Sequence, residues 1–151
     1  MAATPVNVSS AAAPQEKIFS WPVRIYWEDT DAGGIVYYAN YLKYMERART
    51  EWLRAAGIEQ LPLKEQQGLM FVVVDLEAHY RKPARYGDEL QVTCEIAERT
   101  RASLTFQQRI YRGPVANGEL LIEGKVRVAC LDANNLKPKA LPKEFMRSEA
   151  E

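Results

Sequence analysis

The chain has 151 residues with 20 basic and 20 acidic side chains, so its formal net charge is zero. This length fits one domain, which buries roughly 70% of its unfolded surface. A neutral chain offers no overall field for nucleic acid or an anionic membrane surface, so neither partner is expected. No apolar run reaches the roughly 18 residues of a membrane span, and the N-terminus has no secretory pattern. Cys94 and Cys130 lie in strand-like runs, which predicts buried thiols in a reducing, cytoplasmic compartment.

The N-terminal residues 1–17 are rich in Ala, Ser and Pro without apolar periodicity, which predicts a disordered tail. One domain is expected over residues 18–147, followed by a short tail at 148–151. A first strand is predicted over Ile18–Trp27 from its β-branched and aromatic residues. Pro22 lacks a backbone N–H, which places this strand at a sheet edge.

One long amphipathic helix is predicted over residues 40–56, after an acidic glycine-containing loop at 28–34. Its apolar positions recur at steps of three and four residues: Tyr41, Tyr44, Met45, Ala48, Trp52, Leu53 and Ala56. Gly57 marks its C-terminal end. A short second helix is expected over Leu61–Gln67 and ends at Gly68.

The pattern then changes to strands. Four are predicted, at residues 69–82, 89–99, 104–112 and 119–131, with a last short helix near 143–147. The short breaks between the strands predict an antiparallel meander, so the fold class is α+β, with about five strands in one sheet covered by the long helix. The run Met70–Val74 is apolar on both faces, which predicts burial against a second subunit in a homodimer or homotetramer.

Four separated segments carry a resemblance to a known family. Residues 24–38 (RIYWEDTDAGGIVYY) resemble the active-site signature of the 4-hydroxybenzoyl-CoA thioesterase branch of hotdog-fold proteins. Residues 46–51, 83–85 and 137–142 resemble the acyl-CoA thioesterases encoded with the Tol-Pal system within that branch. The resemblance covers about residues 22–145. It implies a sheet wrapped around a long central helix, and hydrolysis of acyl-CoA or acyl-carrier-protein thioesters without a cofactor.

Thioester hydrolysis needs a nucleophile or base, and donors for the oxygen on which negative charge develops. The start of the long helix offers free N–H groups, and Asp31 lies a few residues before it. The resemblance implies that Asp31 attacks directly or activates water, and that the Tyr38 backbone N–H polarises the carbonyl. It also assigns Gly34 and Val36 to substrate binding. The alternative is that Asp31 only closes an Asx turn or caps the helix.

Many of the nearest relatives carry histidine at the position of Tyr38, so a required imidazole is not expected in this chain. The only histidine, His79, lies in a strand-like run and is predicted to be a packing or interface residue. Hotdog dehydratases resemble this fold but pair a histidine with a carboxylate, so hydrolysis is favoured over dehydration. The remaining alternative is a non-catalytic acyl-CoA or acyl-carrier-protein binding module or adaptor.

The phosphates of coenzyme A require local cations in a neutral protein. Candidates flank two strand connections: Arg81, Lys82, Arg85, Arg99 and Arg101. Charged residues at strand ends are often merely solvated, which is the alternative for each. Ser103 matches a hydroxyl position of the relatives and is predicted to orient water or Asp31.

A calcium site in the acidic loop is not expected. An EF-hand starting at Asp29 would need oxygen ligands at its fifth and twelfth positions, which are Gly33 and Asn40. No metal site is therefore predicted.

Overall fold

The computed structural model describes residues 18–146. Its elements in chain order are β1 (Phe19–Arg24), the 3₁₀ turn η1 (Trp27–Asp29), α2 (Asn40–Ala55), α3 (Gln60–Gln67), β2 (Leu69–Tyr80), β3 (Glu89–Arg99), β4 (Ser103–Arg112), β5 (Glu119–Asp132) and the 3₁₀ turn η2 (Lys143–Met146). The predicted α+β class with a five-stranded antiparallel sheet is confirmed. The predicted tails at 1–17 and 148–151 lie outside the described residues.

The five strands form one sheet in the order β1-β3-β4-β5-β2, and every neighbouring pair is antiparallel. The predicted meander is correct for β3, β4 and β5 but wrong for β2, which pairs with β5 at the far edge of the sheet. Residues 83–88 cannot act as a tight hairpin because they are held by other segments: the Ile25 N–H donates to the Asp88 carbonyl at 3.0 Å. This contact directs β3 onto β1, whose edge position agrees with Pro22.

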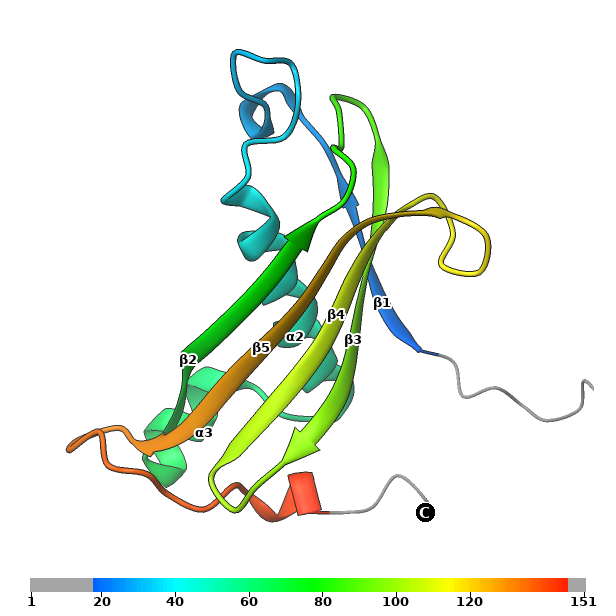
Figure 1. Ribbon diagram of the computed structural model, residues 1–151. Coiled ribbons are helices and arrows are strands. Elements are labelled where there is room, and N and C mark those ends of the chain that lie inside the picture. The colour runs from blue at the N-terminus through cyan, green and yellow to red at the C-terminus, as the bar shows by residue number, and fades with distance from the viewer. Residues whose placement is uncertain (1–17, 147–151) are drawn as a thin grey trace, which may run out of the picture.

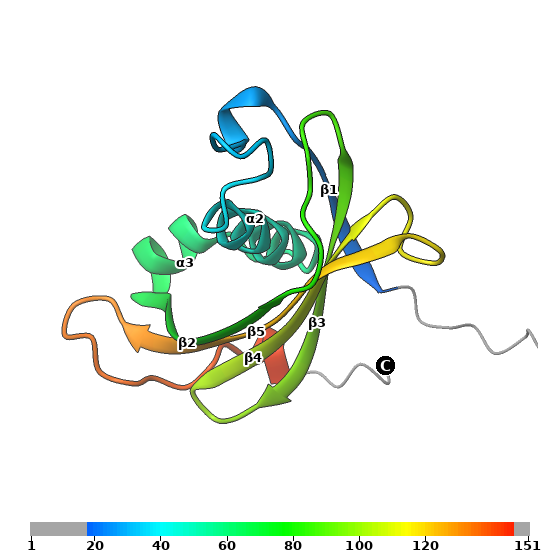
Figure 2. The same ribbon diagram turned by 45° about the horizontal axis from the view of Figure 1, so that its top comes forward.

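The sheet curves around α2, which lies against its concave face (Figures 1 and 2). Alternate residues of β4 and β5 point toward the helix and form the centre of the core: Leu104, Phe106, Ile110, Ile122, Val126 and Val128. At Gly124 the helix comes close to the strand. A Cβ added there would lie 3.0 Å from Cε of Met45 on α2 and 3.2 Å from the Glu77 carbonyl on β2. Glycine therefore allows α2 to pack closely over β5.

The first strand is shorter than predicted and ends at Arg24 rather than Trp27. The residues after it form local hydrogen bonds in place of sheet pairing. The Tyr26 N–H donates to Oδ2 of Asp29 at 2.7 Å, and Oγ1 of Thr30 donates to the Trp27 carbonyl at 2.9 Å. Short polar side chains compete for the backbone in this way and favour a turn.

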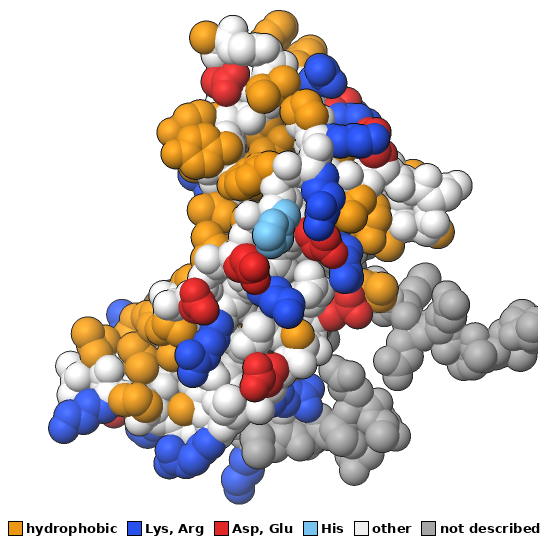
Figure 3. Space-filling view, viewed as in Figure 1, with side chains coloured by type: hydrophobic (Ala, Val, Ile, Leu, Met, Phe, Trp, Pro, Cys, Tyr) orange, Lys and Arg blue, Asp and Glu red, His pale blue; other side chains and the backbone are white. Residues whose placement is uncertain are grey.

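The convex face of the sheet carries interleaved acidic and basic side chains around the single histidine (Figure 3). His79 is exposed and lies 3.3 Å from Oε1 of Glu77, so it does not pack within the chain. Both cysteines are buried free thiols, as predicted. Within residues 18–146, no helix combines the length and apolar character needed to cross a membrane.

Candidate active site

The acidic loop between η1 and α2 folds back on itself. Its ends are joined by a bridge between Thr30 and Val36, with the Asp31 N–H donating to the Ile35 carbonyl at 2.9 Å. The Tyr37 N–H donates to the Asp29 carbonyl at 2.9 Å. The loop is therefore fixed by its own backbone. The Asp29 carbonyl, two residues before Asp31, also accepts from Nδ2 of Asn40, the first residue of α2, at 2.9 Å.

The Asp31 side chain closes an Asx turn. Oδ1 of Asp31 accepts a hydrogen bond from the Gly33 N–H at 2.8 Å. The backbone carbonyl of Asp31 accepts a second one from the Gly34 N–H at 3.0 Å. A Cβ on Gly33 would lie 3.1 Å from the same Oδ1, and Gly34 has φ of +83°. The turn that the sequence left as an alternative to catalysis is present. It holds one carboxylate oxygen, while the exposed side chain keeps its other oxygen unpaired within the described chain.

The first turn of α2 leaves backbone donors available. The residue before the helix, Ala39, has no capping side chain, and no acidic residue lies in the first turn. The Tyr38 N–H donates no hydrogen bond to any residue in the range 18–146. A free amide at the positive end of a helix dipole can stabilise an oxygen that gains negative charge.

The turn at 83–88 forms the neighbouring wall of the site. The Val36 N–H donates to the Ala84 carbonyl at 2.9 Å, and the Ala84 N–H donates to the buried Tyr41 hydroxyl at 3.0 Å. Arg85 forms a bridge with Ile35, so it lies beside the loop that carries Asp31. Its side chain is exposed and has no carboxylate partner among the residues described.

Exposed aromatic side chains surround the loop. Trp27 is 73% exposed and stacks on Tyr86 with ring centroids 4.3 Å apart. The Tyr38 ring is 62% exposed and meets the edge of Tyr80, whose hydroxyl donates to the Tyr38 carbonyl at 3.0 Å. Flat apolar rings left open to solvent around this loop provide a surface for a substrate or a second subunit.

The other predicted cations are already engaged or lie elsewhere. Arg81 pairs with Glu123 at 2.9 Å, and Lys82 pairs with Glu119 at 3.0 Å. To bind a phosphate, Arg81 and Lys82 would each have to share or leave a carboxylate partner, whereas Arg85 would not.

Arg101 and Ser103 lie at the other end of the sheet. Arg101 belongs to the β3–β4 connection and Ser103 is the first residue of β4, whereas the Asp31 loop lies at the end of the sheet where β3 begins (Figure 1). Eleven residues of β3 separate the two ends, which corresponds to roughly 35 Å. Ser103 is buried, and its hydroxyl lies 2.6 Å from Oγ1 of Thr100. Within one chain, Ser103 cannot orient Asp31.

The sequence profile of the thioesterase-like superfamily matches residues 25–148, which include the acidic loop, α2 and strands β2 to β5. The chain belongs to this superfamily. The predicted hotdog fold and the predicted thioesterase family of enzymes are therefore confirmed.

Sequence alignments with named relatives cover most of this thioesterase. It is 48% identical over 126 residues to the acyl-CoA thioesterase YbgC of Haemophilus influenzae, covering 83% of this chain and 90% of the relative. It is 45% identical over 129 residues to the acyl-CoA thioester hydrolase YbgC of Escherichia coli O6:H1, covering 85% and 93%.

Solved structures share the same fold. A probable thioesterase from Bartonella henselae superposes with a TM-score of 0.71 at 31% identity, covering 83% of this chain and 98% of that one. A 1,4-dihydroxy-2-naphthoyl-CoA thioesterase from Synechocystis superposes with a TM-score of 0.78 at 22% identity, covering 86% and 93%, and supports the fold alone.

The sequence reasoning missed two buried features of this thioesterase. Burial and the neighbouring Asp29 carboxylate raise the pKa of Tyr44, and burial raises the pKa of Tyr41, so both phenols stay protonated near neutrality. The second feature is a contact from Arg49 on α2 to Gln108 on β4. Gln108 occupies an inward position in β4, and this break in an otherwise apolar alternation was the signal available in the sequence.

Proposed function

We propose that the protein hydrolyses acyl-CoA thioesters to a free acid and a thiol. The observation that carries this proposal is that the segment leading into α2 contains both a held carboxylate and a free amide. Oδ1 of Asp31 is fixed by the Gly33 N–H, and the Tyr38 N–H at the start of α2 lacks an acceptor in the described chain. The names of the two YbgC relatives support the substrate class.

Two routes use the same groups. In one, the free Asp31 oxygen takes a proton from water, the water oxygen bonds to the carbonyl carbon, and the C–S bond then breaks. In the other, the carboxylate itself bonds to that carbon, the thiolate leaves, and water hydrolyses the resulting anhydride. In both routes the Tyr38 N–H and the helix dipole stabilise the carbonyl oxygen as it gains negative charge, and a proton returns to the thiolate.

The neighbouring residues supply the remaining contacts of this proposal. Gly34 and Val36 form the loop backbone along which the thioester lies, and Arg85 is the cation that meets a coenzyme A phosphate. Arg85 is favoured over Arg81 and Lys82 because the latter two already have carboxylate partners. The distant Arg101 and Ser103 can serve a site only when they come from a partner subunit.

The assembly and setting belong to the same proposal. The enzyme acts as a homodimer or a homotetramer in the cytoplasm, alongside the Tol-Pal system, and accepts acyl-CoA or an acyl carrier protein. Two free buried thiols support a reducing compartment.

The test replaces one carboxylate and spares its neighbour. Asp31→Asn should reduce kcat at least about a hundredfold, because a positioned acid or base contributes that much or more. Glu28→Gln is the matched control, since Glu28 is an exposed carboxylate three residues away that makes no ion pair in the described chain. Thiol release from acyl-CoA is followed, with the melting temperature as a check on folding.

Two results would overturn the assignment. A folded Asp31→Asn protein that works within a few-fold of wild type would remove Asp31 from the chemistry. A wild-type protein that binds acyl-CoA without releasing thiol would instead be a binding module.

A further inference from the structure

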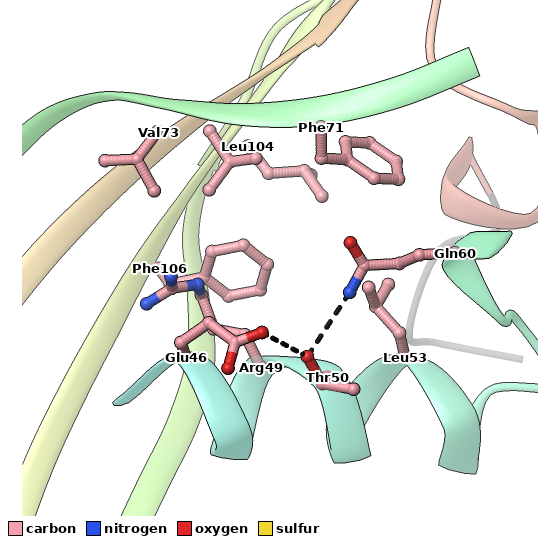
Figure 4. Close-up of a pocket in the computed structure, with 10 residues that line it drawn as sticks. Glu46, Arg49, Thr50, Leu53, Gln60, Phe71, Val73, Leu104 and Phe106 are labelled. Carbon is pink, nitrogen blue, oxygen red and sulfur yellow. Dashed lines mark hydrogen bonds between the residues drawn. The ribbon is translucent and has the colours of Figure 1, made fainter. Parts of the chain in front are cut away.

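A pocket that is partly open to solvent lies between α2 and the sheet (Figure 4). Its sheet side is apolar and includes Phe71, Leu104 and Phe106. Its helix side combines the apolar Leu53 with polar side chains: Glu46, Arg49, Thr50 and, from α3, Gln60. An all-alkyl chain would leave the polar part of this wall without partners.

Arg49 is the donor on the polar wall. Its guanidinium is partly buried, and one hydrogen bond is formed, from Nη1 to Oε1 of the fully buried Gln108 at 3.0 Å. No carboxylate lies within ion-pair distance of Arg49 in the described chain. Burial lowers the pKa of Arg49, although an arginine remains charged near neutrality. The remaining N–H groups are therefore donors that an apolar ligand would leave unpaired, at a cost.

Acceptors lie on the same wall. Oγ1 of Thr50 donates to Oε1 of Glu46 at 2.9 Å, and Nε2 of Gln60 donates to Oγ1 of Thr50 at 3.3 Å (Figure 4). These two bonds leave the second Glu46 oxygen and Oε1 of Gln60 without a donor among residues 18–146. The pocket thus offers both donors and acceptors, next to a charge of each sign.

A second pocket lies beside this one, toward the beginning of the helix. It is lined by Leu42, Met45, Leu76 and Val126, and shares Arg49 and Val73 with the first pocket. Arg49 lies nine residues after Asn40, or roughly 13 Å along the helix axis. Long side chains on helices lean back toward the N-terminus, and Arg49 lines the second pocket together with Leu42 and Met45. A chain that starts at the Tyr38 amide would cross an apolar stretch before it meets Arg49.

We propose that these two neighbouring pockets together hold the acyl chain of the substrate and select a medium-length aliphatic chain with a hydroxyl group near its distal end. The hydroxyl oxygen accepts from Arg49, and its hydrogen is donated to Glu46 or Gln60. This inference rests on the proposed thioesterase function and specifies its substrate class.

Other chain ends fit these groups less well. A plain alkyl end satisfies the apolar wall but leaves Arg49 and Glu46 facing carbon. A terminal carboxylate would pair with Arg49, yet it would place a second negative charge beside Glu46 and could donate no hydrogen bond. A hydroxyl both donates and accepts, and it carries no charge.

The experiment compares decanoyl-CoA, ω-hydroxydecanoyl-CoA and the ω-carboxy counterpart as substrates of the full-length protein. We expect kcat/KM for the ω-hydroxy chain to exceed that of the plain chain about tenfold, as one hydrogen bond to a charged group allows. Arg49→Met should reduce this ratio to near one. Arg47→Met is the matched control, because Arg47 lies over the Tyr44 ring and does not line the pocket. Its ratio should equal that of wild type.

The ratio separates recognition from a structural role, because a general loss of activity affects both substrates equally. If Arg49→Met fails to fold, Arg49→Met combined with Gln108→Met removes the Gln108 Oε1 that would have lost its donor, together with the Nε2 bonds to the Met45 and Thr93 carbonyls, and repeats the test. Melting-temperature shifts with decanoic and ω-hydroxydecanoic acids give a second readout that needs no turnover. Equal rates on the three chains, a preference for the carboxylate, or a ratio unchanged in Arg49→Met would overturn the inference. If wild type hydrolyses no thioester, the proposed function fails, and the acids still test the pocket.

Discussion

Residue by residue, the acidic loop shows how one turn can serve both structure and chemistry. The Gly33 N–H donates a hydrogen bond to the Asp31 carboxylate. Glycine suits this position because a Cβ would lie only 3.1 Å from Oδ1 of Asp31. The Asx turn and the proposed catalytic role therefore need not compete. The turn restricts the rotation of the carboxylate, and a group already held in place reacts without a further loss of entropy.

The role proposed for Tyr38 belongs to its backbone, which two substitutions can separate from its side chain. Tyr38→Pro removes the N–H of a residue that lies outside the helix and donates no hydrogen bond in the described chain. Because one lost oxyanion donor costs about a hundredfold or more in kcat, this variant should be that much slower than Tyr38→Phe, which loses only the hydroxyl. Steady-state kinetics on one acyl-CoA decide the matter. Equal rates for the two variants would assign the oxyanion contact to another group.

Among the elements, the packing of α2 on β5 depends on Gly124. A Cβ there would crowd Cε of Met45 and the Glu77 carbonyl, at 3.0 and 3.2 Å. Gly124→Ala should lower the free energy of unfolding by about 1–3 kcal/mol, the usual range for overpacking. Adding Met45→Leu removes the crowded methyl group, so the double variant should lose less than the sum of the single variants. Urea denaturation measures all three, and strict additivity would contradict this account of the contact.

Ion pairs on the convex face of the sheet are expected to make the stability of the protein depend on pH. Glu123 accepts hydrogen bonds from Arg81 at 2.9 Å and from Arg109 at 3.2 Å, and these guanidinium groups hold the pKa of Glu123 below its usual range. A carboxylate with a lowered folded pKa adds stability above its unfolded pKa, and this contribution disappears as the pH falls through the folded value.

The melting temperatures of wild type and Glu123→Gln are therefore expected to respond differently to pH in the acidic range. Between about pH 7 and pH 3, the melting temperature of Glu123→Gln should fall less steeply than that of wild type, starting from a slightly lower value at neutral pH. Glu98→Gln provides the control, since Glu98 forms no ion pair within the described part of the chain. High salt should reduce the difference. Parallel curves for wild type and Glu123→Gln would show that the ion pairs contribute nothing.

At the scale of the whole molecule, the sequence predicted what depends on local pattern. The ends of α2 and of β3 were predicted to within one residue. Each element buries one face, and this burial produces a regular apolar pattern in the sequence. The pairing of β2 with β5 was not predicted, since it depends on contacts between Ile25 and the turn at 83–88. The loop motif led to Asp31, whereas the separation of Ser103 from it follows from strand direction. Arg49 was missed because a helical pattern treats every arginine as solvent-facing.

The two edges of the sheet differ in how well they resist further pairing. β1 has six residues and includes Pro22, which cannot donate to a neighbouring strand. β2 has twelve residues, and it exposes Val73, Val74 and Leu76 at 52%, 51% and 41%. The pairing with β5 shifts between Val73 and Asp75, which leaves Val74 as an extra residue in the strand. A long edge strand with exposed apolar side chains favours a second chain over solvent.

The last prediction is that the protein is at least a dimer through β2. Light scattering should give a mass of at least twice the 17.2 kDa of one chain. Val74→Lys should shift the protein toward monomer, because a dimer would bury the added charge without a partner. Ile18→Lys is the matched control, as Ile18 is 43% exposed and directly precedes β1 at the opposite edge of the sheet, and the same charge there should leave the mass unchanged. Activity should fall with the dimer fraction of Val74→Lys, because Arg101 and Ser103 can reach an Asp31 loop only from a partner. A monomeric wild type with full activity would remove both the interface and that requirement.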